Sequence, residues 1–246
     1  MTEKPHTLIL TGASRGIGHA TVKRFSDAGW RIITCSRDDV PKSCRYDVNW
    51  THHIPTDLGE EDELAAFVEQ ANELIGDGGL SALVNNAAVS PKTPYKERLG
   101  CLNGDEDAWR EVFELNFFVP LKLCRGFAAA LHRGKGAVVN ITSIAGHQTH
   151  PFAGSAYSVS KAALSSLTRE LAVEFAELDV RVNAVAPGEI ETEMIGPEYE
   201  SLIPRIPLNR LGSAAEVAGT VLQLCSTDFG YVTGTEVFVT GGQHLL

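Results

Sequence analysis

The sequence lacks any apolar run long enough to cross a membrane or to form a secretion signal, and its opening residues MTEKPHTLILTG are broken by charged and polar side chains. We therefore expect a cytoplasmic protein with no membrane partner. Positive charge is also scarce, because 31 acidic residues outnumber 21 basic ones and the net charge is -10. This balance argues against a nucleic-acid partner, since nucleic acids are recognised through basic surfaces.

Cysteine is sparse, and its positions form no recognisable spacing. The sequence contains no C-x-x-C motif and no His/Cys cluster, so neither a disulfide framework nor a zinc site is expected, and we predict no metal. A Pro/Ser-rich linker, an internal repeat and a low-complexity segment are missing as well. The 246 residues therefore predict one domain, residues 1–246. The five cysteines are Cys35, Cys44, Cys101, Cys124 and Cys225.

Short β-branched runs alternate with longer helix-like segments along the whole chain. Strands are expected at 7–11, 31–36, 52–56 (the weakest), 80–87, 136–143, 180–187 and 235–242, and helices at 17–29, 60–75, 105–131, 155–177 and 213–226. This alternation predicts an α/β fold, a doubly wound and mostly parallel sheet of seven strands with helices on both faces. Ligands of such sheets bind beyond the carboxyl ends of the strands.

A glycine-rich turn, TGASRGIG at 11–18, directly follows the first expected strand. Gly12, Gly16 and Gly18 allow a tight turn and close packing of the next helix. The N-terminus of that helix then offers N–H groups to a pyrophosphate. A glycine turn alone is weak, since it is also ordinary turn chemistry. Its position in a strand-helix-strand unit favours a dinucleotide.

The end of the second expected strand carries the signal for cofactor choice. An acid there binds the ribose 2′-hydroxyl of NAD, whereas arginine favours the 2′-phosphate of NADP. Ser36 and Arg37 end this strand, and Arg15 stands in the glycine turn, so NADP(H) is favoured over NAD(H). The alternative is a solvated Arg37, with Asp38 or Asp39 holding the ribose.

Six motifs follow one another in a fixed order: TGASRGIG (11–18), NNAA (85–88), Asn116, Ser143, Tyr157-x-x-x-Lys161 and Pro187-Gly188. In this order and spacing the chain resembles, over nearly its whole length, the short-chain dehydrogenase/reductase superfamily. The resemblance is to its short single-domain members, such as β-ketoacyl-ACP reductases and carbonyl reductases. It implies a Rossmann-like fold, a small-molecule carbonyl or alcohol substrate, and a homo-oligomer, either a dimer or a tetramer.

The resemblance implies a catalytic set of Asn116, Ser143, Tyr157 and Lys161. A phenol titrates near ~10, and an ammonium one helical turn away is expected to lower the pKa of Tyr157. Tyr157 would then exchange a proton with the substrate oxygen as hydride is transferred. Ser143 would bind the same oxygen, Lys161 would also hold the nicotinamide ribose, and Asn116 would hold a water beside Lys161.

The predicted cofactor contacts follow the ends of the strands. Asp57 is either the N-cap of the next helix or a contact to the adenine. The full predicted set is Gly12, Ser14, Arg15, Gly16, Ile17, Gly18, Ser36, Arg37, Asp57, Leu58, Asn86, Ala87, Ala88, Tyr157, Lys161, Pro187, Gly188, Ile190 and Thr192.

The implied activity is NADP(H)-dependent hydride transfer between nicotinamide and a carbonyl or secondary alcohol. An NAD-dependent alcohol or diol dehydrogenase on the same site is the first alternative, and a non-catalytic nucleotide-binding protein is the second. The loop 146–154 follows Ser143 and is expected to border the substrate. Residues 191–207, which include Pro197, Pro204 and Pro207, are expected to form a loop-like lid over the substrate. Residues 90–104 are expected to add to one wall of the substrate site. The candidate substrate contacts of the loop are His147, Gln148, His150 and Phe152.

Overall fold

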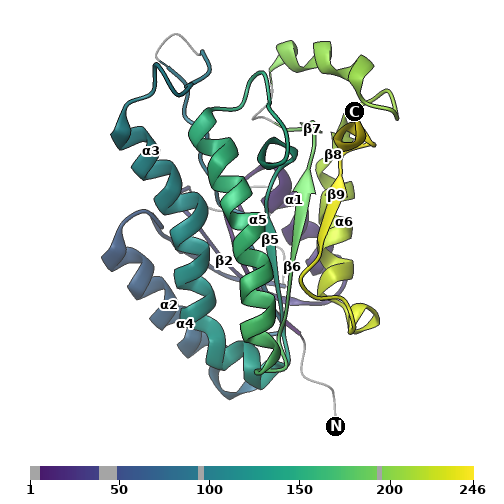
Figure 1. Ribbon diagram of the computed structural model, residues 1–246. Coiled ribbons are helices and arrows are strands. Elements are labelled where there is room, and N and C mark those ends of the chain that lie inside the picture. The colour runs from purple at the N-terminus through teal and green to yellow at the C-terminus, as the bar shows by residue number, and fades with distance from the viewer. Residues whose placement is uncertain (1–5, 39–48, 94–96, 193–195) are drawn as a thin grey trace.

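The computed structural model describes residues 6–38, 49–93, 97–192 and 196–246, and within them seven strands form one parallel sheet (Figure 1). The strand order is β3-β2-β1-β4-β5-β6-β9, as expected for a doubly wound, Rossmann-like domain. The strands are β1 Thr7–Thr11, β2 Arg31–Ser36, β3 Trp50–Pro55, β4 Ala82–Asn85, β5 Ala137–Ile141, β6 Arg181–Pro187 and β9 Glu236–Val239.

Helices cover both faces of the sheet because its central strands are apolar on both sides (Figure 1). Ile9 of β1 joins the core beneath α2, α4 and α5, whereas its neighbours Leu8 and Leu10 join the core beneath α1 and α6. The helices are α1 Gly16–Asp27, α2 Glu61–Ile75, α3 Glu106–Phe113, α4 Val119–Gly134, α5 Ser155–Ala176 and α6 Ala214–Cys225.

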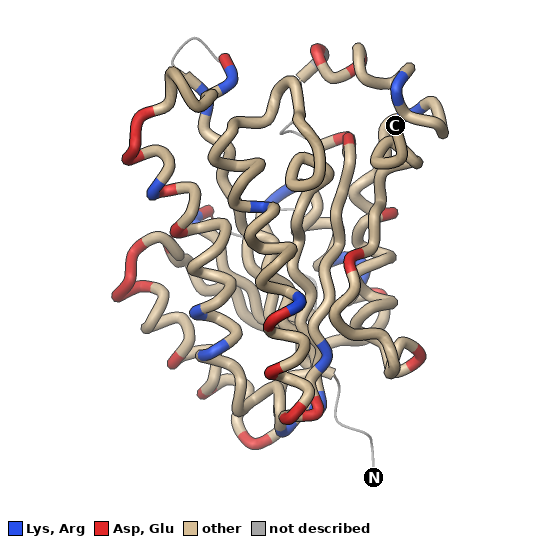
Figure 2. The backbone as a smooth tube through the Cα atoms, viewed as in Figure 1, with Lys and Arg blue, Asp and Glu red and all other residues tan. Residues whose placement is uncertain are grey.

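Acidic residues gather where α2 and α3 begin, as Figure 2 shows by the red segments there. Asp105 caps α3 by accepting a hydrogen bond from Ala108 N–H at 2.7 Å, and Glu106 and Asp107 follow it. Carboxylates at these positions are favoured by the partial positive charge of a helix N-terminus.

Short elements complete the fold around the carboxyl ends of the strands. A two-stranded ribbon pairs β7 with β8, and a 3-10 helix η5 occupies much of the predicted lid. The expectation of a loop-like lid is therefore wrong over this stretch. The short elements are β7 Ile190–Glu191, β8 Gly212–Ser213, η2 Gly76–Gly78, η4 Ile144–Gly146, η5 Pro197–Arg205, η6 Thr227–Phe229 and η7 Gln243–Leu245.

The helix predicted over 105–131 is not regular. A π-helical segment, η3 Glu114–Phe118, separates α3 from α4. Pro120 lacks the N–H that would bond to the carbonyl of Asn116 in an α-helix, and the side chain of Asn116 is bonded elsewhere, so the α-helical ladder is interrupted here. The third strand also begins at Trp50 rather than at residue 52. Asp39, Pro41 and Cys44 lie outside the described residues.

Candidate active site

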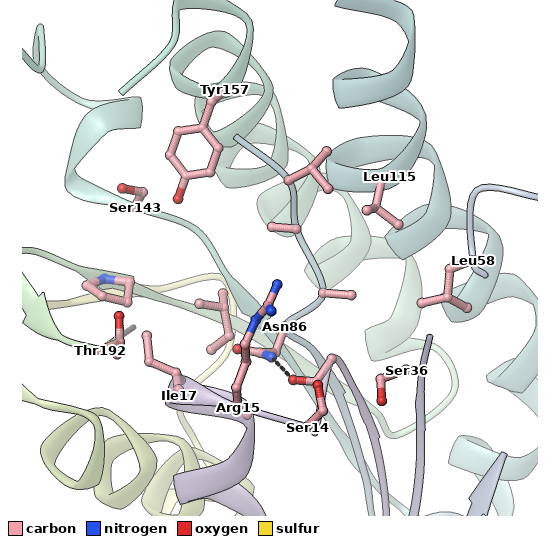
Figure 3. Close-up of a pocket in the computed structure, with 18 of the residues that line it drawn as sticks. Ser14, Arg15, Ile17, Ser36, Leu58, Asn86, Leu115, Ser143, Tyr157 and Thr192 are labelled. Atoms are coloured by element: carbon pink, nitrogen blue, oxygen red, sulfur yellow. Dashed lines mark hydrogen bonds between the residues drawn. The ribbon is translucent and has the colours of Figure 1, made fainter. Parts of the chain in front are cut away.

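One cleft at the carboxyl ends of the strands collects nearly all the predicted site residues (Figure 3). Every predicted cofactor contact lines it, and so does Ser143. Of the predicted catalytic and cofactor residues, Asn116 alone does not line it, and none of the candidate substrate contacts in the loop 146–154 does. Thr56, Leu115 and Thr142, which the sequence did not single out, line the cleft as well.

The glycine turn is built so that backbone approaches backbone. Gly12 and Gly16 have φ of 68° and 54°, a region that favours glycine. A Cβ on Gly18 would lie 2.0 Å from the Gly12 carbonyl oxygen. Arg15 precedes α1 in an extended conformation and gives it no side-chain cap, so the first N–H groups of the helix face the cleft uncapped. This cradle fits a pyrophosphate, which would bind through those N–H groups.

Asn86 and Thr11 fasten the glycine turn to the end of β4. The Asn86 side-chain amide donates to the carbonyl oxygens of Thr11 at 3.0 Å and Gly12 at 2.9 Å. In return the Thr11 hydroxyl accepts the backbone N–H of Asn86 and of Ala87, both at 3.0 Å. The Asn86 amide nitrogen is therefore committed to the turn. Thr11 was not predicted, although its place at the end of β1 was a usable signal.

The end of β2 brings a cation and an anion together at the cleft. The Arg37 guanidinium lies 4.0 Å from the Asp57 carboxylate, and both side chains are substantially exposed. Asp57 does not cap α2, whose N-cap position is Glu60, so that alternative is wrong. Instead its carboxylate accepts from Gly59 N–H at 3.0 Å. Ser36 donates to the backbone carbonyl of Asp38 at 2.8 Å.

Tyr157 and Ser143 lie side by side in the cleft, and the hydroxyl of Tyr157 points toward Ser143 (Figure 3). The pKa of Tyr157 is raised above its ordinary value, first by the low-polarity surroundings of the phenol. The nearby Ser143 hydroxyl opposes this rise in the pKa, and the charge of Glu189 adds to it. The expectation of a lowered pKa is therefore wrong for this ligand-free geometry.

The surroundings of Lys161 show why its amine does not lower the pKa of Tyr157. Its amine is buried and donates to the carbonyl oxygen of Ile141 at 2.7 Å, and it lies 5.7 Å from the centre of the Tyr157 ring. Burial lowers the pKa of Lys161 to about 7. Lys161 is therefore only partly charged at neutral pH, and desolvation is the largest influence on the pKa of Tyr157.

Asn116 is fully buried behind the cleft and ties the π-helical segment to the loop after β4. Its side-chain oxygen accepts from Val89 N–H at 2.9 Å, and its amide donates to the Val89 carbonyl at 3.0 Å and to the Ser160 hydroxyl at 3.1 Å. These bonds set Val89, which lines the cleft, relative to the helix that carries Tyr157 and Lys161.

The two histidines of the loop after Ser143 contact different parts of the structure. His150 turns inward and donates to the buried carboxylate of Glu189 at 2.8 Å. His147 instead pairs with Glu236 of β9 at 2.9 Å, and neither His147 nor Gln148 lines the cleft. Phe152 packs against Tyr199 of η5 with ring centres 4.8 Å apart. Glu189 was missed, although an acid inside the apolar run VNAVAPGEI was a signal.

Known proteins resemble this chain over almost its whole length. The family described as Enoyl-(Acyl carrier protein) reductase matches residues 12–244. Protein FixR of Bradyrhizobium diazoefficiens is 49% identical over 244 residues, which cover 98% of this chain and 88% of FixR. The chain belongs to the short-chain dehydrogenase/reductase superfamily.

Solved members of the superfamily agree with this assignment. An oxidoreductase from Brucella ovis, in complex with partially ordered NAD, is 44% identical, with a TM-score of 0.82 over 96% of this chain and all of that one. A 3-oxoacyl-[acyl-carrier protein] reductase from Brucella melitensis is 30% identical, with a TM-score of 0.89 over 100% of this chain and 93% of that one. This short-chain dehydrogenase/reductase is thus an oxidoreductase of CH–OH and C=O groups with a nicotinamide cofactor. Across the described ranges, no helix has the length and apolarity needed to span a bilayer.

Proposed function

We propose that the protein is an NADP(H)-dependent reductase of ketones or aldehydes, working reversibly on the matching alcohols. The observation that carries this proposal is the placement of two hydroxyl groups, those of Tyr157 and Ser143, in the same cleft as the glycine turn. A reducible carbonyl oxygen placed between the two hydroxyls would meet two hydrogen-bond donors and would lie next to the bound cofactor.

When bound, the nicotinamide supplies or accepts the hydride. Tyr157 gives its phenolic proton to the substrate oxygen, and Ser143 donates a hydrogen bond to the charge developing there. Lys161 holds the ribose of the cofactor and returns a proton to Tyr157. Asn116 positions Val89 and the helix that carries Tyr157 and Lys161.

The raised pKa of Tyr157 supports the reductive direction. A phenol with a raised pKa is protonated at neutral pH, and reduction of a carbonyl needs a proton donor. Oxidation of an alcohol needs the phenolate, which the surroundings of Tyr157 disfavour. Reduction can therefore proceed from the protonated phenol of Tyr157, whereas oxidation requires Tyr157 to lose its proton first.

Preference for NADP(H) is supported by the basic and hydroxyl groups at the end of β2. Arg15, Ser36 and Arg37 all line the part of the cleft beyond β1 and β2, where a ribose 2′-phosphate would lie. NAD(H) is the second candidate, because the Brucella ovis protein carries NAD and because Asp57 stands beside Arg37. Titration of the protein with NADPH and with NADH, followed by nicotinamide fluorescence, decides between them.

The test of the activity is a panel of ketones and aldehydes with each reduced cofactor, read by loss of absorbance. Tyr157→Phe is expected to lose nearly all turnover and to bind cofactor as before. The matched control is Tyr231→Phe, which changes a fully exposed tyrosine and should leave turnover unchanged. A fully active Tyr157→Phe variant would refute the role given to Tyr157. Binding of cofactor without turnover across the whole panel would count against a catalytic protein.

A homo-oligomer, dimer or tetramer, acting in the cytoplasm completes the proposal. Val159 and Val173 of α5 are 48% and 74% exposed, and Phe118, just before α4, is 43% exposed. Large apolar side chains exposed on neighbouring helices favour burial against another copy. Sedimentation of the purified protein tests this, and a monomer at micromolar concentration would contradict it.

A further inference from the structure

Glu189 is a buried carboxylate at the edge of the cleft, and the proposed reaction does not use it. It follows β6 and stands between Gly188 and Ile190, which both line the cleft. Only 4% of Glu189 is exposed. A buried carboxylate is unfavourable unless its oxygens are well bonded, so its partners indicate what it is there to do.

The partners of Glu189 are neutral. His150 donates through Nε2 at 2.8 Å, and its other ring nitrogen accepts the backbone N–H of Ala153 at 3.0 Å and of Phe152 at 3.2 Å. Because Nδ1 is occupied as an acceptor, the hydrogen of the ring sits on Nε2 and the imidazole is neutral. Gln243 donates to the same carboxylate oxygen, Oε1, at 3.1 Å. The negative charge of Glu189 thus meets no cation within the described structure.

Two acceptor atoms of this cluster remain without a donor. The carbonyl oxygen of Gln243 is buried and has no hydrogen-bond partner in the described structure, and the residue is only 6% exposed. It lies against Gly188, since a Cβ on that glycine would be 3.1 Å from it. Both hydrogen bonds that Glu189 accepts from described residues go to Oε1, which leaves Oε2 without a donor among them. A cluster with two free acceptors beside a cleft is complementary to a ligand that brings donors.

The cluster is also close to the reacting groups. The charge of Glu189 raises the pKa of Tyr157, and it contributes after burial to raising the pKa of Tyr199 to about 12. Tyr199 belongs to η5 and covers His150, with ring centres 6.0 Å apart. Glu189 is therefore near enough for its charge to act on both phenols, while its partner His150 contacts Tyr199 of η5.

We propose that Glu189 is a specificity-determining residue that accepts a hydrogen bond from a hydroxyl group on the carbon next to the reacting carbonyl. The substrate class is then α-hydroxy ketones or aldehydes and the vicinal diols formed from them. This inference rests on the proposed carbonyl reduction. Substrates with a carboxylate at that position are repelled by Glu189. A hydroxyl is favoured over an ammonium because a second charge would have to lose its water beside a carboxylate that is only 4% exposed.

The test compares three ketones of matched size, which are hydroxyacetone, butanone and aminoacetone. In the wild-type protein, kcat/KM for hydroxyacetone should exceed that for butanone by about tenfold or more, the effect of one hydrogen bond to a charged acceptor. Glu189→Gln should reduce this ratio by about tenfold, mainly by slowing hydroxyacetone. Pyruvate should be a poor substrate of the wild type and a better one of Glu189→Gln.

The chain offers a control in Glu106, an exposed carboxylate that pairs with Arg110 at 2.7 Å and does not line the cleft. Glu106→Gln should keep the wild-type ratio. Glu189→Asp, which keeps the charge but withdraws it by one methylene, should give an intermediate ratio and serves if Glu189→Gln does not fold. An equal loss for hydroxyacetone and butanone would mean that Glu189 only supports the loop, and a preference for aminoacetone would overturn the hydroxyl class.

A binding measurement separates failure of this inference from failure of the proposed function. Hydroxyacetone and butanone are titrated into Tyr157→Phe loaded with reduced cofactor, where no turnover interferes, and binding is read by nicotinamide fluorescence. Tighter binding of hydroxyacetone that Glu189→Gln abolishes supports the inference even if no ketone is reduced. Turnover of ketones with equal binding of both ligands would support the reductase and overturn the role of Glu189.

Discussion

The amine of Lys161 donates to the carbonyl oxygen of Ile141 at 2.7 Å, and the two residues fix the buried end of α5 against β5. This bond keeps a lysine in a place from which water is excluded, since only 2% of the residue is exposed. An ammonium is disfavoured there, and for this reason the pKa of Lys161 falls to about 7.

The stability of the ligand-free protein should therefore depend on pH through Lys161. Between pH 7 and the ordinary lysine pKa, the unfolded chain holds a proton that the folded chain has released. The free energy of unfolding therefore rises with pH in this window. Below pH 7 the full cost of burying the charged amine is present. From pH 7 to pH 9 the gain from this residue should be about 2 kcal/mol. Urea unfolding of the wild type and of Lys161→Met measures it. Parallel curves for the two proteins would refute the prediction.

Asn116 should contribute strongly to the free energy of unfolding. Asn116→Ala removes a fully buried amide and takes from the part-buried N–H and C=O groups of Val89 their partners, so the expected loss is about 2–3 kcal/mol. Asn103→Ala, at an exposed position with two local bonds, is the control and should lose less than about 1 kcal/mol. Urea unfolding compares them, and similar losses in both variants would show that Asn116 is not an anchor.

Gly18 should tolerate no side chain. In Gly18→Ala the new Cβ would meet the Gly12 carbonyl at 2.0 Å, so the turn must open and cofactor affinity should be lost. Gly219→Ala is the matched control within a helix, because nothing lies within 4 Å of its added Cβ. That variant should gain about 0.5–1 kcal/mol and bind cofactor normally. Calorimetric titration with NADPH checks both, and normal binding by Gly18→Ala would contradict the cradle.

Arg37 and Asp57 should pull cofactor preference in opposite directions. Arg37→Ser is expected to weaken NADPH binding by about tenfold and to change NADH binding little, because only NADPH carries the 2′-phosphate. Asp57→Asn removes a negative charge beside that phosphate and should shift preference further toward NADPH. Arg24→Gln, an exposed charge change in the last turn of α1, controls for net charge. Equal effects of Arg37→Ser on both cofactors would remove the basis for the NADP(H) assignment.

The sequence predicted most of the fold because strand ends and glycine turns are local signals. The run TLILT followed by glycines located β1 and the turn correctly, and parallel strands then brought the ends of β1, β2, β4, β5 and β6 to one edge. What it could not predict depends on contacts between distant segments. The bond between His150 and Glu189 joins residues 39 positions apart, and nothing near either residue encodes it.

The pKa of Tyr157 was predicted in the wrong direction for the same reason. The spacing of Tyr157 and Lys161 correctly placed both side chains at one cleft, but spacing carries no information about desolvation. Burial of both groups is a property of the assembled domain, and here it outweighs their mutual attraction.

The π-helical turn at Glu114–Phe118 holds one residue more than an α-helix of the same rise would need. Deleting that residue would place Pro120 inside a continuous helix, where its ring would meet the carbonyl four residues earlier. The wide turn thus accommodates Pro120 and at the same time carries the side chain of Asn116 to Val89 and Ser160, so the defect in the helix is also the anchor of the segment behind the cleft.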